Sequence, residues 1–328
     1  MTNLQPGTNL NQSPSCSYRV STLLTANLGD RVAVEPGVPC GTCFLCLDGR
    51  YNLCEDVQFA GVYPYHGTIQ RYKCHTAKWC HKLPPNVSFA EGALLEPLSV
   101  VMHGINSAGL SLGRGAVICG AGPIGLLALA AARASGAHPL VITDLEPKRL
   151  EFARRFVPSA VTYQVDRTLD AQANAQKIRE LFDFQNIGEY GAPEVVLECT
   201  GVENSVVTAA YTTRRGGTVM VIGVGREIMS NLPFMHLSLA EVCPKNQSST
   251  TSKPFADIVP QIDLKFINRY RDTWPAGLQC LAGGILDLKP LVSHTYPLEK
   301  AMDALHTCGD LSNGSIKVQI VDERDDVL

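Results

Sequence analysis

Residues 117–127 read Val-Ile-Cys-Gly-Ala-Gly-Pro-Ile-Gly-Leu-Leu, and the fold can be predicted from this segment. The apolar run Ala116–Cys119 predicts a buried strand, and the alanine-rich residues 124–134 predict a helix. Between them stand three glycines in the pattern G-x-G-x-x-G, the arrangement of a dinucleotide-binding turn. The first glycine allows the tight turn, the second lets backbone amides approach a pyrophosphate, and the third lets helix and strand pack closely. The segment therefore predicts a coenzyme site at a helix N-terminus.

An acidic residue completes this pattern. Asp144 ends the next predicted strand, 24 residues after Gly120. A carboxylate there accepts hydrogen bonds from ribose hydroxyls and repels a 2′-phosphate, so NAD is favoured over NADP. A helix start in an unrelated α/β protein is the alternative, but strand, glycines, helix and acid stand here in the required order. The predicted coenzyme-binding residues of this segment are Gly120, Gly122, Pro123, Ile124, Gly125 and Asp144.

The sequence around this segment has two regions with different patterns of predicted secondary structure. From Ala116 onward apolar strands alternate with helices, which predicts a parallel sheet with crossover helices, a doubly wound Rossmann domain. Residues 30–90 instead alternate short β-like runs with Gly/Pro turns, which predicts a small barrel or sandwich. The expected strands of the sheet are Ala116–Cys119, Leu140–Thr143, Val195–Glu198, Thr218–Ile222 and Asp263–Ile267; those elsewhere are Arg31–Val34, Thr68–Tyr72, Trp79–Leu83 and Ile316–Ile320.

Length and composition indicate a globular protein with two domains. With 328 residues the chain is long enough for two domains, and 45% hydrophobic and 18% charged residues are typical of a globular protein. The net charge of −3 and the lack of a Lys/Arg run argue against a nucleic-acid or membrane-surface partner. Residues 1–17 are polar and resemble no secretory signal, and Leu126–Ala132 is too short to span a bilayer. A cytoplasmic location is expected.

Four of the twelve cysteines, Cys40, Cys43, Cys46 and Cys54, are spaced C-x2-C-x2-C-x7-C. That spacing lets one loop place four thiolates around Zn²⁺ with no open position, so the predicted site is structural rather than catalytic. Two disulfides are the alternative, but they need an oxidising compartment for which no other feature argues. The pairs Cys74-His75 and Cys80-His81 are interpreted as buried cysteines and satisfied histidines, because neighbours on a strand point to opposite faces. Core positions are expected for Cys119, Cys199, Cys280 and Cys308.

Several segments together resemble the zinc-containing medium-chain dehydrogenases, and most of all their polyol branch of sorbitol, xylitol and L-arabinitol dehydrogenases. They are GDRVAVEPGVPC (29–40), the cysteine lobe, WCHKLPPNVSFAEGALLEPLSV (79–100), VICGAGPIGLL, VITDLEPKRL (141–150), LECTGVE (197–203), NRYRDTWP (268–275) and SIKVQI (315–320). The resemblance covers residues 29–241 and 262–322, and L-arabinitol dehydrogenases are the nearest group. It implies a GroES-like β-barrel catalytic domain around a Rossmann domain, a homo-tetramer or dimer, and oxidation of a polyol to a ketose with zinc as Lewis acid.

The resemblance also implies roles for single residues. Glu96, in the segment EPLSV, matches the family's carboxylate at the catalytic zinc, although a helix-start acid is the plainer interpretation. Arg269 and Tyr270 match residues that contact polyol hydroxyls, and Phe59 falls in the segment that lines the substrate pocket. At the coenzyme, Arg149 matches a residue near the adenine, and Thr200 and Val224 are further expected contacts. Without the family context each would be assigned to core or surface.

Two departures from the family pattern stand out. Relatives carry an early G-x-C-G-S-D segment and a G-H-E segment, which supply the catalytic zinc's cysteine and histidine. Nothing before Gly29 resembles either, the only early cysteine is Cys16, and no histidine precedes His66. Because a catalytic zinc normally has three protein ligands, we expect Glu96 alone to be a remnant of that site and the barrel to be truncated at its N-terminus.

The second departure is a run of 20 residues, Val242–Gln261, that is rich in Ser, Thr, Lys and Pro. Its end residues are compatible with splice-site codons, so a retained in-frame intron and a misplaced start are one hypothesis. A genuine surface loop is the other, since insertions between elements cost little free energy.

The sequence thus predicts four regions. Residues 1–28 are unmatched and expected to be disordered, 29–100 form the GroES-like domain with the zinc lobe, 101–268 form the NAD-binding domain with the insert, and 269–328 return to the catalytic domain. The predicted activity is NAD-dependent polyol oxidation. The alternatives are a non-catalytic protein that binds NAD and structural zinc, and a zinc-free reductase, which the cysteine lobe and EPLSV disfavour.

Overall fold

The computed structural model describes residues 27, 29–182, 187–238, 261–310 and 313–322. The chain divides into two compact units, one made of Val100–Asn268 and the other of the segments on either side. Apart from Asn27 and Gln261, the predicted disordered start 1–28 and the insert Val242–Gln261 lie outside the described residues, as does Cys16. Within the described part of the chain no helix combines the length and the apolar character needed to cross a bilayer.

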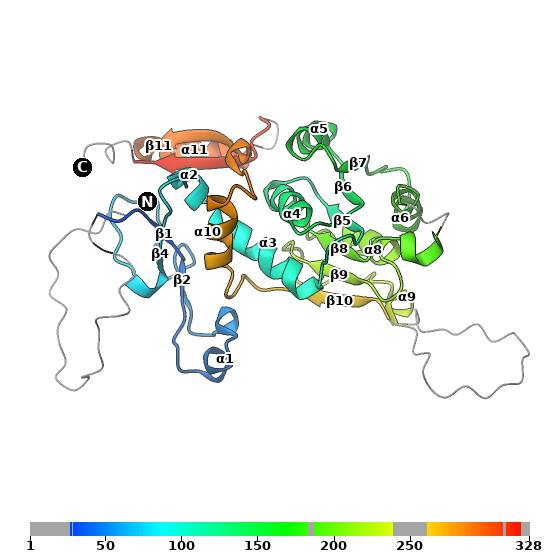
Figure 1. The fold of residues 1–328 in the computed structure, drawn as a ribbon, viewed down its shortest axis with the longest axis horizontal. Coiled ribbons are helices and arrows are strands. Elements are labelled where there is room, and N and C mark those ends of the chain that lie inside the picture. The colour runs from blue at the N-terminus through cyan, green and yellow to red at the C-terminus, as the bar shows by residue number, and fades with distance from the viewer. Residues whose placement is uncertain (1–26, 28, 183–186, 239–260, 311–312, 323–328) are drawn as a thin grey trace, which may run out of the picture. The chain divides into compact units, whose positions relative to one another are not determined.

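The unit Val100–Asn268 is built on one six-stranded sheet (Figure 1). Its strands all run parallel, in the order β10-β9-β8-β5-β6-β7. They are β5 (Ala116–Cys119), β6 (Leu140–Asp144), β7 (Val161–Gln164), β8 (Val195–Glu198), β9 (Thr218–Val221) and β10 (Asp263–Phe266). The chain winds outward from β5 to β7 and then returns to β8 on the other side of β5. This reversal is the switch point of a doubly wound sheet, where such folds bind their ligands.

Helices cover both faces of this sheet (Figure 1). On one face lie α4 (Pro123–Ala134) and α5 (Pro147–Phe156), and on the other lie α6 (Ala171–Arg179) and α8 (Glu203–Thr212). The central strands β5, β8 and β9 are buried along their whole length, as expected for strands covered on both sides. The core on the α6 and α8 face is contributed mainly by Val117, Val141, Ile178, Val196, Val206 and Val219. A short helix, α9 (Phe234–Ser238), follows β9.

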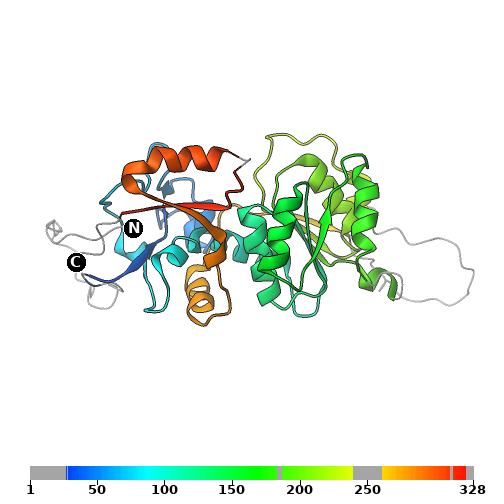
Figure 2. The same ribbon diagram turned by 90° about the horizontal axis from the view of Figure 1, so that it is seen from above.

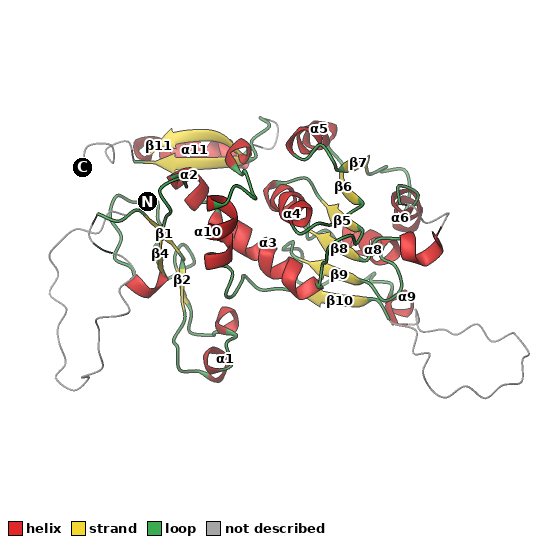
Figure 3. Cartoon of the chain, in the orientation of Figure 1, coloured by secondary structure: helices red, strands yellow, loops and turns green. Residues whose placement is uncertain are grey.

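The other unit contains short sheets and helices (Figure 3). Its described strands form three two-stranded sheets: β1 (Val32–Val34) with β4 (Cys80–Lys82), β2 (Gly37–Val38) with β3 (Gln58–Phe59), and β11 (Val292–Pro297) with β12 (Lys317–Val321). Its helices are α1 (Phe44–Leu47), α2 (Phe89–Gly92), α10 (Trp274–Ala282) and α11 (Ala301–Gly309), and α3 (Leu95–Ala108) runs from this unit into the next. Figure 2 shows β11 and β12 side by side, with α11 packed on them.

One predicted strand is wrong. Residues Thr68–Tyr72 form bends and irregular backbone, and no described strand pairs with them. Side-chain interactions hold this segment instead: the Gln70 amide donates to the Gly67 carbonyl at 2.6 Å, and the Arg71 guanidinium pairs with Asp322 at 2.7 Å. The other predicted strands are present to within one or two residues at their ends.

Two of the cysteines outside the lobe that were predicted to be buried are not. Cys74 and Cys308 are exposed, whereas Cys80 and Cys119 are buried as predicted. Both histidines next to Cys74 and Cys80 are satisfied by one buried residue, Glu35. His75 Nε2 lies 2.9 Å from the Glu35 carbonyl oxygen, and His81 Nε2 lies 2.8 Å from its carboxylate.

Candidate coenzyme, zinc and substrate sites

The glycine turn between β5 and α4 is shaped by close backbone approach. Gly120 has φ of +96°, and a Cβ on it would lie 2.7 Å from Cγ2 of Thr200. A Cβ on Gly125 would overlap the Gly120 carbonyl oxygen. Both positions therefore need glycine for the fold itself.

Gly122, at the N-cap of α4, differs from these two. A Cβ there would meet nothing within 4 Å, and no side chain caps the helix. Pro123 takes the first helical position, where its missing N–H leaves no bond unmade, and Ile124 follows it in the first turn. Open space in front of uncapped helix N–H groups and a positive helix end suits the pyrophosphate of a dinucleotide. The turn fits the coenzyme that the sequence predicts.

Asp144, the last residue of β6, ties this turn to the adjacent strand. Its carboxylate accepts the N–H of Ala121 at 2.7 Å and the N–H of Glu146 at 2.8 Å, and a guanidinium nitrogen of Arg149 lies 3.9 Å away. Each carboxylate oxygen has two lone pairs, so each can accept one further hydrogen bond, such as one from a ribose hydroxyl. The side chain therefore has a structural role as well as its predicted coenzyme role.

A second set of residues gathers after β8 and β9. Thr200 and Val224 line a cavity of about 640 Å³ together with Glu203, Arg226 and Asn231. Thr200 is held by Glu198, a fully buried carboxylate that was not among the predicted site residues. Glu198 accepts the N–H groups of Thr200 and Gly201, each at 2.9 Å, and the Ser205 hydroxyl at 2.9 Å. The sequence did contain a signal for this role, because Glu198 is an acidic residue at the end of an otherwise apolar strand.

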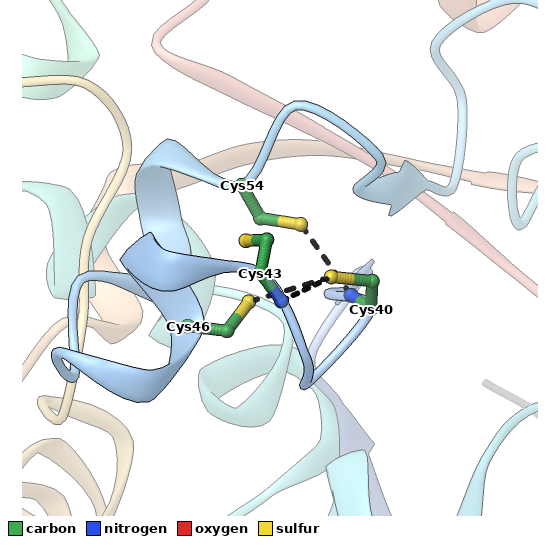
Figure 4. A group of neighbouring side chains, drawn as sticks. All are labelled: Cys40, Cys43, Cys46 and Cys54. Atoms are coloured by element: carbon green, nitrogen blue, oxygen red, sulfur yellow. Dashed lines mark hydrogen bonds between the residues drawn. The ribbon is translucent and has the colours of Figure 1, made fainter.

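The four lobe cysteines converge on one point (Figure 4). Their sulfur atoms all lie within 4.8 Å of one another, and all four carry free thiols. N–H groups of Thr42 and Cys43 point at the Cys40 sulfur at 3.5 and 3.3 Å. These bonds stabilise the thiolate and lower the pKa of Cys40 to about 6. Four converging sulfurs are a donor set that fits tetrahedral Zn²⁺.

Two of the four predicted catalytic residues, Glu96 and Phe59, line a cavity in the unit that carries the cysteine lobe. Glu96, in the first turn of α3, lines a space of about 380 Å³ whose other walls include Phe59 and Trp274. The Arg269 guanidinium lies 4.1 Å above the Phe59 ring, and the buried Tyr270 ring lies 6.1 Å from Trp274. Fold contacts thus bring Glu96, Phe59, Arg269 and Tyr270 into one region, although they are up to 211 positions apart in sequence.

Burial dominates the electrostatics of this region. It raises the pKa of Glu96 above its ordinary value, and the positive charges of Lys317 and Arg269 oppose the rise. Burial likewise raises the pKa of Tyr270, and the nearby Glu96 and Glu35 carboxylates add to that effect. Tyr270 is therefore a neutral hydroxyl at physiological pH, able to donate or accept hydrogen bonds.

The described residues do not fit a catalytic zinc. Across the residues that the structure describes, the lobe cysteines are the only group of three or more Cys, His, Asp or Glu side chains that converges on one point. Glu96 belongs to no such group, and one carboxylate does not hold Zn²⁺ tightly.

Comparison with known proteins shows the family to which this chain belongs. Residues 123–262 match the zinc-binding dehydrogenase family and residues 20–85 match the alcohol dehydrogenase GroES-like domain. The chain is 46% identical to L-arabinitol 4-dehydrogenase of Aspergillus niger over 302 residues, which cover 91% of this chain and 72% of that one. The chain belongs to the zinc-dependent medium-chain dehydrogenases, in their polyol branch. The predicted family, fold class and cofactors, NAD and structural zinc, are confirmed.

Other relatives support the same placement. The chain is 41% identical to sorbitol dehydrogenase of Bos taurus over 279 residues, covering 85% of this chain and 70% of that one. Among solved structures, L-idonate 5-dehydrogenase of Escherichia coli superposes with a TM-score of 0.73 at 28% identity, covering 90% of this chain and 76% of that one. These likenesses extend over both units of the dehydrogenase and therefore over both predicted sites.

Proposed function

We propose that this protein oxidises a polyol, of the class of L-arabinitol, xylitol or sorbitol, to a ketose by transferring hydride to NAD⁺. The observation that supports this proposal most strongly is the glycine turn, which is hydrogen-bonded to Asp144 and has open space in front of the α4 N-terminus. The names of its relatives, L-arabinitol 4-dehydrogenase and sorbitol dehydrogenase, supply the substrate class. We assign the adenine side to Arg149 and the remaining coenzyme contacts to Gly120, Gly122, Pro123, Ile124, Gly125, Thr200 and Val224.

We assign substrate binding to the cavity residues Glu96 and Phe59 and to Arg269 and Tyr270, which contact the cavity walls Phe59 and Trp274. Arg269 and Tyr270 donate hydrogen bonds to polyol hydroxyls, and Phe59 forms part of the wall. Oxidation of an alcohol releases a hydride and a proton, and NAD⁺ takes the hydride. Glu96 is the one carboxylate among the described residues that line this cavity, and its raised pKa makes it a stronger proton acceptor than an exposed carboxylate. The proposed reaction uses no catalytic zinc, because the described residues do not form a site for one.

The four lobe cysteines are assigned to one structural Zn²⁺. When bound there, zinc supplies cross-linking of the loop and no open coordination position. We further propose a cytoplasmic protein that assembles as a homo-dimer or tetramer and acts on small molecules rather than on nucleic acid or a membrane.

A specific observation favours a second candidate, a protein that binds NAD and structural zinc without catalysis. It is that Glu96 has no converging companion ligands among the described residues. Zinc content, NADH affinity and NAD⁺ reduction with L-arabinitol, xylitol and sorbitol, all measured on the purified chain, separate the two. NAD⁺ reduction by any of these polyols establishes the dehydrogenase. About one zinc per chain with NADH binding but no turnover selects the second candidate, and no NADH binding rejects both.

A further inference from the structure

The turn that carries Arg269 and Tyr270 has an unusual backbone. Arg269 and Asp272 have φ of +55° and +54°, and they are the only described residues other than glycine with positive φ. L-residues adopt this region at a free-energy cost, and a bulky arginine tolerates it less well than aspartate does. Two such residues within one four-residue turn persist only where neighbouring groups hold them.

The neighbouring groups come from the cysteine lobe. The Tyr51 hydroxyl accepts the backbone N–H of Asp272 at 2.7 Å, and the Gly49 carbonyl accepts the Arg271 guanidinium at 3.2 Å. Gly49 and Tyr51 stand between the third and fourth lobe cysteines, Cys46 and Cys54. The two bonds therefore join the turn to the part of the chain that the metal encloses.

The lobe has little apolar core with which to hold its own shape. Its helix α1 has only four residues and buries none of them, and Phe44 and Leu47 are 71% and 76% exposed. Loops that bury so little apolar surface rely on cross-links such as bound zinc for a defined conformation. The positions of Gly49 and Tyr51 accordingly depend on what the four sulfurs hold.

The turn also contacts the interior of this unit through aromatic side chains. Directly after the turn, Trp274 stacks on His81 at 5.0 Å between ring centroids, and His81 is paired with the buried Glu35. On the lobe side, the Tyr51 ring lies 5.3 Å from Trp79. These are the two tryptophans of the chain, so one reports on each side of the turn.

We infer that the cysteine lobe is a positioning device for the substrate turn: zinc at the four cysteines fixes Gly49 and Tyr51, and these set the conformation of residues 269–272. Tyr51 is then a positioning residue for Arg269 and Tyr270. The description of these two as polyol contacts rests on the proposed function, whereas the coupling itself rests on the hydrogen bonds and the backbone of the turn.

The test uses Trp79→Phe protein, in which Trp274 is the only tryptophan. Its emission is compared in zinc-loaded protein and in protein stripped with a chelator, with the zinc content measured in each sample. We expect a shift in Trp274 emission on stripping and its reversal when Zn²⁺ is added back. Adding Tyr51→Phe, which removes only the hydroxyl, should shift the emission of protein that still holds its zinc. Tyr72→Phe, the same change at an exposed tyrosine of the same unit, should not.

A second measurement needs no tryptophan substitution. Trypsin cleaves after Arg269 and Arg271, and the rate of cleavage there reports opening of the turn. We expect zinc removal or Tyr51→Phe to speed this cleavage about tenfold, as for a loop that loses its holding contacts. Cleavage after the exposed Arg226, in the other unit, should stay unchanged.

Trp274 emission and cleavage at the two arginines that remain the same after zinc is removed would overturn the inference. So would equality of the Tyr51→Phe and Tyr72→Phe proteins at full zinc content. Neither readout needs polyol or NAD⁺, so a chain that shows the coupling but no turnover rejects the proposed activity alone. Where turnover is present, Tyr51→Phe should raise KM for the polyol more than it lowers kcat, with KM for NAD⁺ unchanged.

Discussion

At the scale of single residues, the proposed coenzyme and proton-transfer roles depend on two carboxylates, Asp144 and Glu96, whose surroundings differ. Asp144 accepts two backbone N–H groups, whereas Glu96 lies in a mostly apolar cavity. We therefore propose hydrogen bonding to the coenzyme for Asp144 and proton transfer for Glu96. Each assignment has a test of its own.

Neutralising Asp144 should weaken coenzyme binding. Asp144→Asn keeps the shape of the side chain but replaces a charge-assisted acceptor, and one of its two terminal atoms becomes a donor facing the backbone N–H groups. We expect the Kd for NADH, measured by fluorescence titration, to rise about 10- to 100-fold, the loss typical of one or two charge-assisted hydrogen bonds. Asp263→Asn, on the outer strand β10 of the same sheet, is the control. Equal affinity in the Asp144→Asn and Asp263→Asn proteins would contradict the assignment.

Removing the charge of Glu96 should stabilise the protein at neutral pH while lowering any turnover. Because burial raises the pKa of Glu96, the folded state binds this proton more tightly than the unfolded state does. The free energy of unfolding therefore falls as pH rises from the unfolded pKa through the raised folded pKa. Glu96→Gln has no such loss, so its thermal midpoint should exceed that of wild type at pH 7.5. The difference should vanish at about pH 3, where wild-type Glu96 is protonated in both states. A wild-type midpoint higher at pH 7.5 would show a stabilising ion pair instead.

At the scale of elements, the turn between β5 and α4 separates packing from binding. A Cβ at Gly125 overlaps the Gly120 carbonyl, whereas a Cβ at Gly122 points into open space. Gly125→Ala should therefore lower the free energy of unfolding by about 2 kcal/mol or more, as in other overpacked sites. Gly122→Ala should leave the free energy of unfolding within about 1 kcal/mol of wild type, but it should weaken NADH binding because the methyl group occupies pyrophosphate space. NADH affinity unchanged by Gly122→Ala would show that the phosphates lie elsewhere.

At the scale of the whole molecule, the outer strand of the sheet bears on assembly. β10 ends the described sheet, and Phe266 on it is 64% exposed. An unpaired strand edge with an exposed aromatic ring is a site where a second copy can pair. We expect the purified chain to sediment as a dimer or tetramer, and Phe266→Glu to shift it toward monomer. Asp263→Asn on the same strand is the matched control, and a wild-type monomer at micromolar concentration would exclude this assembly.

Features of this protein that depend on local spacing could be predicted from its amino-acid sequence. The glycine turn, the acid that follows 24 residues later and the four-cysteine lobe lie in short segments, so turn geometry and strand period were enough to predict them. All strands of the parallel sheet except β7 were predicted to within a residue. For the central strands β5, β8 and β9 the reason is burial on both faces, which makes their residues mostly apolar. β7 was missed because its residues are not buried.

Features that depend on contacts between residues distant in sequence could be seen only in the folded chain. Thr68–Tyr72 has a strand-like composition, but a strand needs a partner, and the ion pair between Arg71 and Asp322 holds that segment another way. The gathering of Glu96, Phe59 and Arg269, and the hydrogen bonds from the lobe to the 269–272 turn, join positions tens to hundreds of residues apart. No local pattern encodes such contacts, because they follow from packing of the folded chain rather than from the period of a strand or helix.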